Sequence, residues 1–339
     1  MAGVCLWDGD RPDCDAEIRR ARSAGFFRQR PALAAPLRVL GAGCPDLAWW
    51  AEPLNDPRDC EMTFQHRDPK WTGMKWIVFL LLSSLPAHAM GPWQDRCLEQ
   101  EPCYVGDRSY HVKEPDGWDG KTPLPVMLHF HGWQRQGTLI VQHGRISGAS
   151  RRRGVLLVAP NGLGRSWDFW DAGTDDVPFA RAVLDDIKKR YPVQEDQIFV
   201  SGYSWGANMA WRFVCEDGAD IAALMAVSGT LDQDEDCATA PREARQVYGL
   251  KDNVLDFPYG PNGEQDNVVR LWREAYDCGA SEDKGPWKQV DHLTMQRTEW
   301  NTCAAGRVSL DIHPGGHFIP HGWFARQLDE LLGLEFSYP

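Results

Sequence analysis

From residue 108 onward, short apolar runs alternate with stretches that have helical spacing. A continuous apolar run such as residues 154–160 is typical of a strand buried on both faces, whereas residues 177–191 have the period of an amphipathic helix. Alternation of this kind predicts an α/β fold: a mainly parallel, doubly wound sheet covered by helices on both faces. We expect strands at residues 108–113, 125–131, 154–160, 197–202, 221–228, 244–249 and 307–313, and helices at 177–191, 207–215, 267–276 and 323–332.

Length and composition indicate how many domains the chain forms and which class of partner is excluded. The chain has 339 residues, 43% of them hydrophobic, and a formal net charge of −12. Residues 90–339 contain no repeat or linker, so we expect them to form a single catalytic domain. The acidic balance argues against a nucleic-acid partner, which requires a basic face. The basic run at residues 151–153 is interpreted as a solvated loop.

Residues 74–89, MKWIVFLLLSSLPAHA, have the pattern of a secretory signal peptide. Lys75 supplies the positive start, residues 77–85 the apolar core, and Ala87-His88-Ala89 the small-residue ending. The apolar run is too short to span a bilayer as a helix, so we expect no stable membrane insertion. The alternative is a buried core helix. Export, extracellular or periplasmic, with cleavage near Ala89 is the favoured interpretation.

Residues 1–73 precede this signal and show no sustained hydrophobic period. We interpret them as a disordered extension that results from an upstream start assignment, with translation beginning at Met74. The alternative is a genuine small N-terminal region.

The cysteines agree with export. Six follow the predicted cleavage site: Cys97, Cys103, Cys215, Cys237, Cys278 and Cys303. Six cysteines allow 15 pairings, and the sequence does not choose among them. Proximity along the chain favours 97–103, 215–237 and 278–303, and an oxidising compartment favours disulfides over six buried thiols.

The pentapeptide Gly202-Tyr203-Ser204-Trp205-Gly206 has the form G-x-S-x-G. This pattern also arises by chance, so its context decides its meaning. An apolar strand precedes it and a helical stretch follows it. At such a corner a serine hydroxyl is presented above the sheet beside a helix N-terminus, which predicts a nucleophile at Ser204 rather than an ordinary turn serine.

A serine nucleophile needs a base and an orienting carboxylate, which on this kind of sheet follow in the order Ser, acid, His. Asp252 follows the strand at residues 244–249 and is the expected acid, with Asp256 as the alternative. Weaker alternatives follow the preceding strand: Asp232, Asp234 and Asp236.

The expected base is His317, because the paired glycines Gly315 and Gly316 allow the chain to bend back over the sheet after its last strand. His313 and His321 flank this position and are the other candidates.

Two backbone N–H groups are expected to stabilise the oxyanion. Trp205 follows the nucleophile, and Trp133 follows the strand that ends in His131-Gly132. Five tryptophans fall on or beside the loops of this predicted rim: Trp133, Trp167, Trp170, Trp205 and Trp323. They either wall a cleft, in which case Trp167 and Trp170 bind substrate, or simply pack the loops.

Two metal interpretations are set aside. His129 and His131 lie on one face of a strand, but no third ligand has convincing spacing. Residues 232–243 imitate part of a calcium loop, yet Cys237 stands where glycine is needed. We therefore expect no metal and no organic cofactor.

At these residues the chain resembles the secreted polyhydroxybutyrate depolymerases and feruloyl esterases of the α/β-hydrolase fold. The likeness covers residues 97–334 and includes the turn at 159–162, the start of the helix at 175–177, the serine elbow, Gly249-x-x-Asp252 and Gly315-Gly316-His317. The resemblance implies Ser204, Asp252 and His317 as a catalytic triad, with Trp133 and Trp205 as oxyanion donors. The sequence departs from the family at Trp205, Asp256 and His321, which leaves the specificity pocket open.

The resemblance implies a secreted serine esterase that works through an acyl-enzyme on a small or oligomeric ester. Short polyhydroxyalkanoate (hydroxybutyrate) esters are the first expectation for the substrate, and feruloyl or acetyl esters of plant polysaccharides are the alternative. A serine exopeptidase and a non-catalytic binding protein on a hydrolase scaffold are weaker alternatives.

Overall fold

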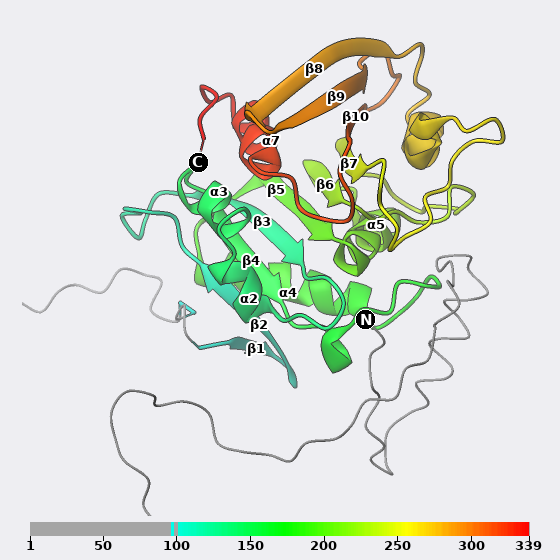
Figure 1. The fold of residues 1–339 in the computed structure, drawn as a ribbon. Coiled ribbons are helices and arrows are strands. Elements are labelled where there is room, and N and C mark those ends of the chain that lie inside the picture. The colour runs from blue at the N-terminus through cyan, green and yellow to red at the C-terminus, as the bar shows by residue number, and fades with distance from the viewer. Residues whose placement is uncertain (1–95, 98–100, 339) are drawn as a thin grey trace, which may run out of the picture. The chain divides into compact units, whose positions relative to one another are not determined.

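The computed structural model describes residues 96–97 and 101–338, and they form one sheet with helices on both faces (Figure 1). The predicted signal peptide and the extension before it lie outside the described residues. The strands are β1 (Cys103–Val105), β2 (Arg108–Lys113), β3 (Leu124–Phe130), β4 (Leu156–Pro160), β5 (Val193–Tyr203), β6 (Ala223–Val227), β7 (Glu243–Gly249), β8 (Glu282–Val290), β9 (Leu293–Trp300) and β10 (Arg307–His313). The helices are α2 (Gly137–Gln142), α3 (Ser147–Arg151), η1 (Leu163–Arg165), α4 (Asp176–Arg190), α5 (Trp205–Asp217), η2 (Gln265–Val269), α6 (Arg270–Ala275) and α7 (Trp323–Leu332).

The strands lie in the order β1-β2-β4-β3-β5-β6-β7-β10-β9-β8. From β4 to β10 all neighbours pair in parallel, and the strands at both edges pair antiparallel. The expectation of a mainly parallel, doubly wound sheet is thereby confirmed. Parallel strands bring their carboxyl ends to one edge, where ligands of such sheets bind.

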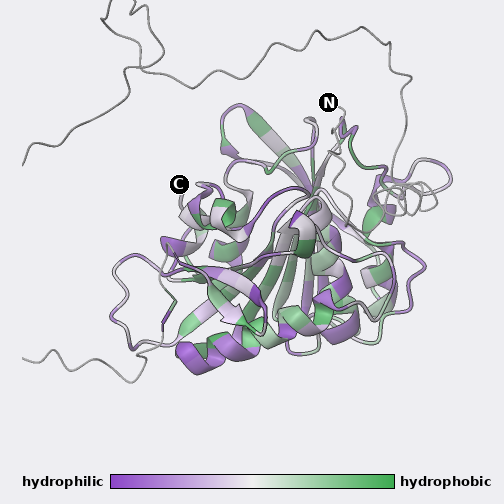
Figure 2. Cartoon of the chain, turned by 90° about the horizontal axis from the view of Figure 1, so that it is seen from below, coloured by the Kyte–Doolittle hydropathy of each residue, from purple (hydrophilic) through white to green (hydrophobic). Residues whose placement is uncertain are grey.

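Two hydrophobic cores lie on opposite faces of the sheet, because successive strand residues point to opposite sides. On β3, Val126 and Leu128 join the core under α4, α5 and α6, whereas Met127 joins the core under α2, α3 and α7. On β5, Val200 and Phe199 divide in the same way. Figure 2 shows the result, with apolar strands in the middle layer and hydrophilic helix faces outside.

Three disulfides join Cys97 to Cys103, Cys215 to Cys237 and Cys278 to Cys303. These are the pairs that proximity along the chain favours, so the expected pairing is confirmed. No helix of the described residues is long and apolar enough to cross a membrane.

The structure contains elements that the sequence did not predict: β1, α2, α3 and the hairpin β8–β9. The hairpin residues are mostly polar, because β8 is exposed along much of its length. The pairing of β8 with β9 shifts register between Asp283 and Gly285 and again between Lys288 and Val290.

Two aspartates at the start of α4, Asp175 and Asp176, have different roles. Asp175 occupies the N-cap position, but its side chain makes no capping hydrogen bond. The buried Asp176 carboxylate instead accepts hydrogen bonds from Arg108 Nη2 (2.6 Å) and Asp168 N–H (2.7 Å). Asp176 therefore ties α4 to β2 and to the loop before the helix.

A buried carboxylate, Asp311 of β10, joins the hairpin to the rest of the sheet. Its two oxygens accept hydrogen bonds from Arg297 Nε (2.9 Å) and Nη2 (2.8 Å). They also accept from the indole N–H groups of Trp287 on β8 (2.7 Å) and Trp323 on α7 (2.8 Å). Arg297 donates further to Glu330 of α7 (2.7 Å). One carboxylate thus connects three strands and a helix.

Arg297→Met should lower the free energy of unfolding by about 3–5 kcal/mol, because it leaves Asp311 buried without its cation. Urea denaturation followed by circular dichroism measures the change. The matched control is Arg307→Met, since the Arg307 side chain is 51% exposed and lies 3.8 Å from Glu243. Such a surface pair contributes only about 0–1 kcal/mol. Equal effects of the two substitutions would refute the role of Asp311.

Four histidines are buried at the sheet: His111, His129, His131 and His313. Burial lowers the pKa of His111 below its usual value. Burial lowers the pKa of His129 to about 3 and that of His131 to about 4. Burial likewise lowers the pKa of His313 to about 4. All four therefore stay neutral in the folded protein at pH values where an unfolded chain protonates them.

The free energy of unfolding should consequently fall as the pH drops from about 6.5 towards 4. The unfolded chain binds protons in this window that the folded chain does not, and each histidine contributes up to about 1.4 kcal/mol per pH unit. Urea titrations at a series of pH values between 7.5 and 5 measure the slope, and NMR of the imidazole nitrogens reports the protonation state. A stability that is flat across this range would contradict the prediction.

Candidate active site

Ser204 lies at the sharp turn between β5 and α5. Its backbone has φ 57° and ψ −126°, a left-handed conformation that a residue with a side chain rarely adopts. Strain of this kind persists only where the surroundings enforce it, and it is typical of the strand-to-helix turn that carries a nucleophile. Ser204 is 8% exposed.

Close backbone approach explains both glycines of the pentapeptide. A Cβ atom on Gly202 would lie 2.0 Å from the Gly206 carbonyl oxygen, and a Cβ on Gly206 would lie 2.0 Å from the Phe130 carbonyl oxygen. Neither position has room for a side chain. The elbow therefore packs directly onto the end of β3.

The structure brings together three side chains that are far apart in the sequence. Ser204 Oγ lies 2.8 Å from His317 Nε2, and His317 Nδ1 lies 2.7 Å from Asp252 Oδ2. A carboxylate only accepts hydrogen bonds, so Nδ1 carries the proton and Nε2 is left to accept the serine hydroxyl proton. This arrangement can transfer a proton from Ser204 to His317 and stabilise the resulting imidazolium.

Backbone N–H groups fix the carboxylate. Asp252 Oδ1 accepts hydrogen bonds from the N–H of Val254 (3.0 Å) and Leu255 (3.3 Å), which leaves Oδ2 for His317. The Asp252 side chain is only 1% exposed. The carboxylate that contacts His317 is therefore Asp252, the expected acid.

The glycine-rich segment before His317 is held on two sides. Lys251 N–H donates to the Gly315 carbonyl (2.9 Å), and the Tyr203 hydroxyl donates to the His317 carbonyl (3.1 Å). The rings of Tyr203 and His317 lie 5.0 Å apart between centroids. Both the turn after β7 and the residue before the nucleophile thus position the imidazole.

The other two histidines near this segment have different surroundings. His313 is buried on β10, where its Nδ1 accepts the Gly315 N–H (3.1 Å). His321 contacts Arg145 and the Tyr338 hydroxyl. Neither His313 nor His321 takes the place of His317 beside Ser204.

The two expected oxyanion donors flank Ser204. Trp205 is the first residue of α5, and the first N–H groups of a helix have no intrahelical acceptor. Trp133 follows Gly132, and a Cβ on Gly132 would lie 3.6 Å from Ser204 Cβ. The loop after β3 therefore reaches the nucleophile, and a donor there could act with Trp205 on a developing negative charge.

An aromatic cluster borders this position. The Trp205 ring lies 5.5 Å from that of Trp133, 5.5 Å from that of Trp170 and 5.6 Å from that of Phe169. Trp205 is nearly buried, whereas Trp133 is 50% exposed. The cluster thus presents one accessible indole, supported from beneath by further rings.

Two of the five tryptophans, Trp167 and Trp323, are almost completely buried. Trp167 is 1% exposed, and its indole N–H donates to the His131 carbonyl (2.8 Å). Trp323 is fully buried and donates to Asp311. Trp167 nevertheless lines a cavity of about 250 Å³ together with Trp170, so the expectation that these two residues bind substrate stays a prediction. The sequence places these residues near loops but gives no direction for their side chains.

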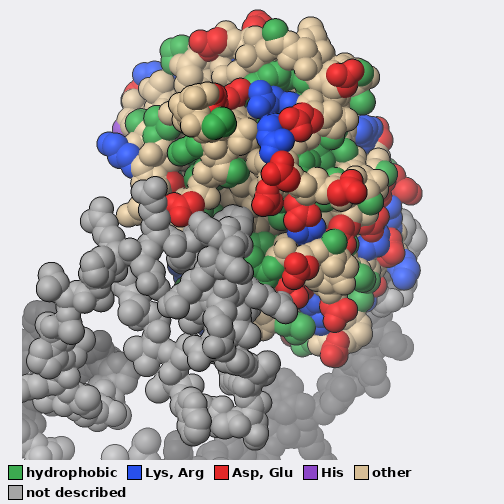
Figure 3. Space-filling model, turned by 90° about the vertical axis from the view of Figure 1, so that its right-hand side faces the viewer, with side chains coloured by type: hydrophobic (Ala, Val, Ile, Leu, Met, Phe, Trp, Pro, Cys, Tyr) green, Lys and Arg blue, Asp and Glu red, His purple; other side chains and the backbone are tan. Residues whose placement is uncertain are grey.

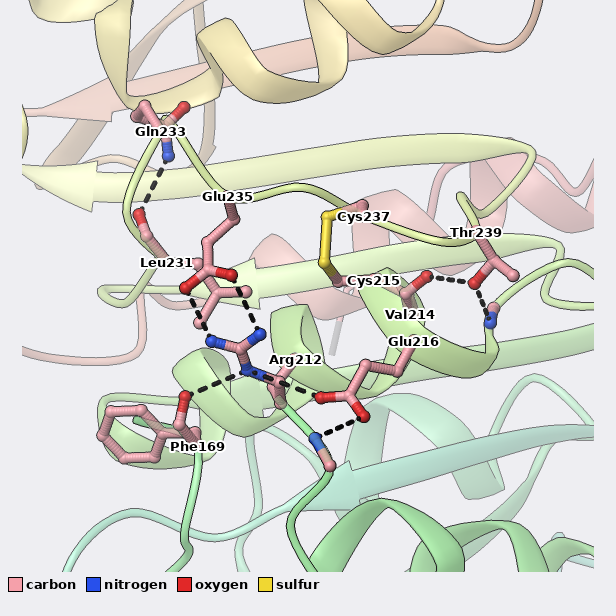
Figure 4. Close-up of a disulfide and its surroundings, with 12 residues drawn as sticks. Phe169, Arg212, Val214, Cys215, Glu216, Leu231, Gln233, Glu235, Cys237 and Thr239 are labelled. Carbon is pink, nitrogen blue, oxygen red and sulfur yellow. Dashed lines mark hydrogen bonds and ion pairs between the residues drawn. A yellow bond between two sulfur atoms is a disulfide. The ribbon is translucent and has the colours of Figure 1, made fainter. Parts of the chain in front are cut away.

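A buried arginine supports the aromatic cluster, as Figure 4 shows. Arg212 of α5 donates from Nε to the Phe169 carbonyl (3.1 Å) and from both Nη atoms to Glu235 (3.0 and 2.8 Å). The disulfide between Cys215 and Cys237 links the same helix to the segment that carries Glu235. The loop that carries Phe169 and Trp170 is therefore held to α5 by the hydrogen bond from Arg212.

The two histidines on β3 are engaged within the protein. His129 Nδ1 lies 2.9 Å from Ser201 Oγ. His131 Nδ1 lies 2.9 Å from the Gly132 carbonyl, and its Nε2 accepts the Gly162 N–H (3.0 Å). Across the part of the chain that the structure describes, no group of three or more His, Cys, Asp or Glu residues is placed to hold a metal ion.

No family model matches the chain. Feruloyl esterase C from Emericella nidulans is 28% identical over 221 residues, which cover 63% of this chain and 77% of that protein. A bifunctional acetylxylan esterase/xylanase from Neocallimastix patriciarum is 23% identical over 201 residues, or 59% of this chain and 29% of that protein.

Among solved structures, the acetyl xylan esterase from Aspergillus awamori is similar, with a TM-score of 0.50 and 14% identity. The match covers 67% of this chain and 94% of that chain. This likeness concerns the fold, and the sequence relatives carry the class of activity. The sequence relatives and the shared fold together indicate that the chain is a carboxylic ester hydrolase with the α/β-hydrolase fold.

Proposed function

We propose that the chain is a secreted serine esterase that cleaves aromatic acyl esters, of the feruloyl kind, from plant polysaccharides. The observation that carries the mechanism is the continuous hydrogen-bonded series from Ser204 through His317 to Asp252. The similarity to feruloyl esterase C and the exposed indole of Trp133 favour an aromatic acyl group over hydroxybutyrate. Acetyl esters are the second candidate, because the acetyl xylan esterase shares the fold.

In the proposed reaction, Ser204 Oγ attacks the ester carbonyl while His317 Nε2 takes its proton. The N–H groups of Trp133 and Trp205 stabilise the oxyanion of the tetrahedral intermediate. His317 then gives the proton to the leaving alcohol oxygen, and an acyl group remains on Ser204. Water, deprotonated by His317, attacks this acyl-enzyme and releases the acid, which restores the serine hydroxyl.

The acyl group is proposed to lie against Trp133. An aromatic ring stacked on an indole gains about 0.5–1.5 kcal/mol beyond the burial of its area. Trp133 is suited to this because its ring is half exposed, while Trp205 and Trp170 fix its surroundings. A hydroxybutyryl group has no ring and gains nothing from this arrangement.

Secretion is proposed from two independent features. Three disulfides are typical of an oxidising compartment outside the cytosol. Residues 74–89 carry the pattern of a signal peptide.

Ser204→Ala should lower kcat for methyl ferulate by about 10³-fold or more, because the nucleophile is removed. Initial rates with purified protein measure this, and mass spectrometry should find a fluorophosphonate adduct on Ser204 of the unaltered chain. The control is Ser309→Ala on β10, which should retain its activity and its adduct. A binding protein on a hydrolase scaffold would show neither turnover nor labelling, which would refute the proposal.

Trp133→Ala should lower kcat/KM for methyl ferulate by about two- to thirteenfold, since a stacking contact of roughly 0.5–1.5 kcal/mol is lost. The rate with ethyl acetate should change little, because the backbone N–H of residue 133 remains. Trp133→Phe should recover part of the loss. Tyr104→Ala is the control, an exposed aromatic on β1 at the edge of the sheet. An equal loss on both substrates would contradict an aryl site at Trp133.

A further inference from the structure

A cavity of about 560 Å³ lies between α3 and α7, away from Ser204 and outside the proposed chemistry. Its walls include His143, Arg145, Arg152, His321 and Tyr338. The two helices lie side by side, with the C-terminal end of the chain next to them (Figure 1). The cavity also borders the segment that follows His317, since His321 is part of both.

The charge of this cavity is opposite to that of the protein. The chain has a formal net charge of −12, and the face drawn in Figure 3 carries many Asp and Glu side chains. The residues that line the cavity, in contrast, include two arginines and two histidines and no carboxylate. A site of this composition attracts anions.

The hydrogen bonds of Arg145 leave its positive charge in place. One Nη atom donates to the Ile319 carbonyl (2.5 Å) and the other to His321 Nε2. Neither acceptor carries a negative charge. His321 is therefore the Nδ1–H tautomer, and Nδ1 donates to the Tyr338 hydroxyl (3.2 Å). The guanidinium is thus oriented by neutral groups, which keeps its fork of N–H donors fixed.

Arg152 differs from its two neighbours in sequence. Arg151 forms an ion pair with Asp116, and Arg153 pairs with the buried Asp329 (2.6 Å). Arg152 lines the cavity and is exposed. The run at residues 151–153 is expected from the sequence to be a solvated loop, but it begins at the end of α3. Its three side chains lie in three different surroundings.

The pKa values of the two histidines that line the cavity are both lowered. The pKa of His143 is lowered by burial and then by Arg145. The pKa of His321 is lowered by burial, by Arg145 and by His292, whose ring lies 5.6 Å away. Burial, the larger cause, disfavours any charge, but the second contribution shows that the positive charge of Arg145 acts on both imidazoles.

We propose that this cavity binds an oxyanion, either a carboxylate or a sulfate or phosphate group, between Arg145 and Arg152. Guanidinium groups bind such anions through paired, charge-assisted N–H donors. The anion can come from a uronic acid unit of a polysaccharide or from a free inorganic salt. The first source rests on the proposed function, whereas the site itself does not.

The test is isothermal titration calorimetry of the purified protein at low ionic strength, where screening is weak. Sodium D-glucuronate and sodium sulfate are the two probes, and D-glucose is the uncharged control for glucuronate. Saturable binding of either anion, without binding of glucose, is the expected result. Binding of glucuronate alone identifies a carboxylate sugar as the ligand, and binding of both identifies a general oxyanion site. Absence of saturable binding by both anions overturns the proposal.

Two variants locate the site. Arg145→Met and Arg152→Met should each weaken anion binding by about tenfold or more, because each removes charge-assisted hydrogen bonds. Because Arg152 is exposed, we expect Arg152→Met to leave the fold intact. This variant therefore still tests the site if Arg145→Met destabilises the segment after His317. The control is Arg307→Met, an exposed arginine of β10 outside the cavity. Unaltered binding by Arg152→Met, or an equal loss with Arg307→Met, overturns the assignment. Methyl ferulate hydrolysis, measured in parallel, reports the proposed function separately.

Discussion

The close contact between the backbones of the serine turn and of β3 sets the geometry of the whole catalytic edge. A Cβ on Gly206 would collide with the Phe130 carbonyl oxygen of β3, and a Cβ on Gly202 would collide with the Gly206 carbonyl oxygen inside the turn itself, so neither position accommodates anything larger than hydrogen. Ser204 is thereby forced into a left-handed conformation, and the loop after β3 is brought to the same place. The strain at one residue is compensated by two strands that are buried on both faces, so the position of the hydroxyl is fixed before any substrate arrives.

The sequence predicts those parts of the fold that follow from burial on both sides. β4 and β6 are uninterrupted apolar runs, and α7 has the bounds that its period indicates. The hairpin β8–β9 is missed because no residue of β8 is fully buried and β9 alternates buried residues with polar ones, so neither strand is a continuous apolar run. The short helices α2 and α3 lie below the length at which a helical period can be recognised.

At the site, the sequence gives the residue types and their order but not their directions. Spacing alone could not separate Asp252 from Asp256, whereas the N–H groups of Val254 and Leu255 orient Asp252 in the structure. Nor could spacing show that Trp167 points inward while Trp133 stays half exposed. Such differences depend on hydrogen bonds to other segments, such as that from Trp167 to the His131 carbonyl, which no local pattern contains. The same holds for the arginines around α3, whose partners come from distant parts of the chain.

The two register shifts along β8 have a consequence for how copies of the protein meet. A regular outer strand offers a row of unused N–H and C=O groups on which another chain can add. In β8 this row is interrupted where the register shifts, Pro286 removes one donor, and Lys288 places a cation nearby. The border strand is thus a poor template for cross-β growth.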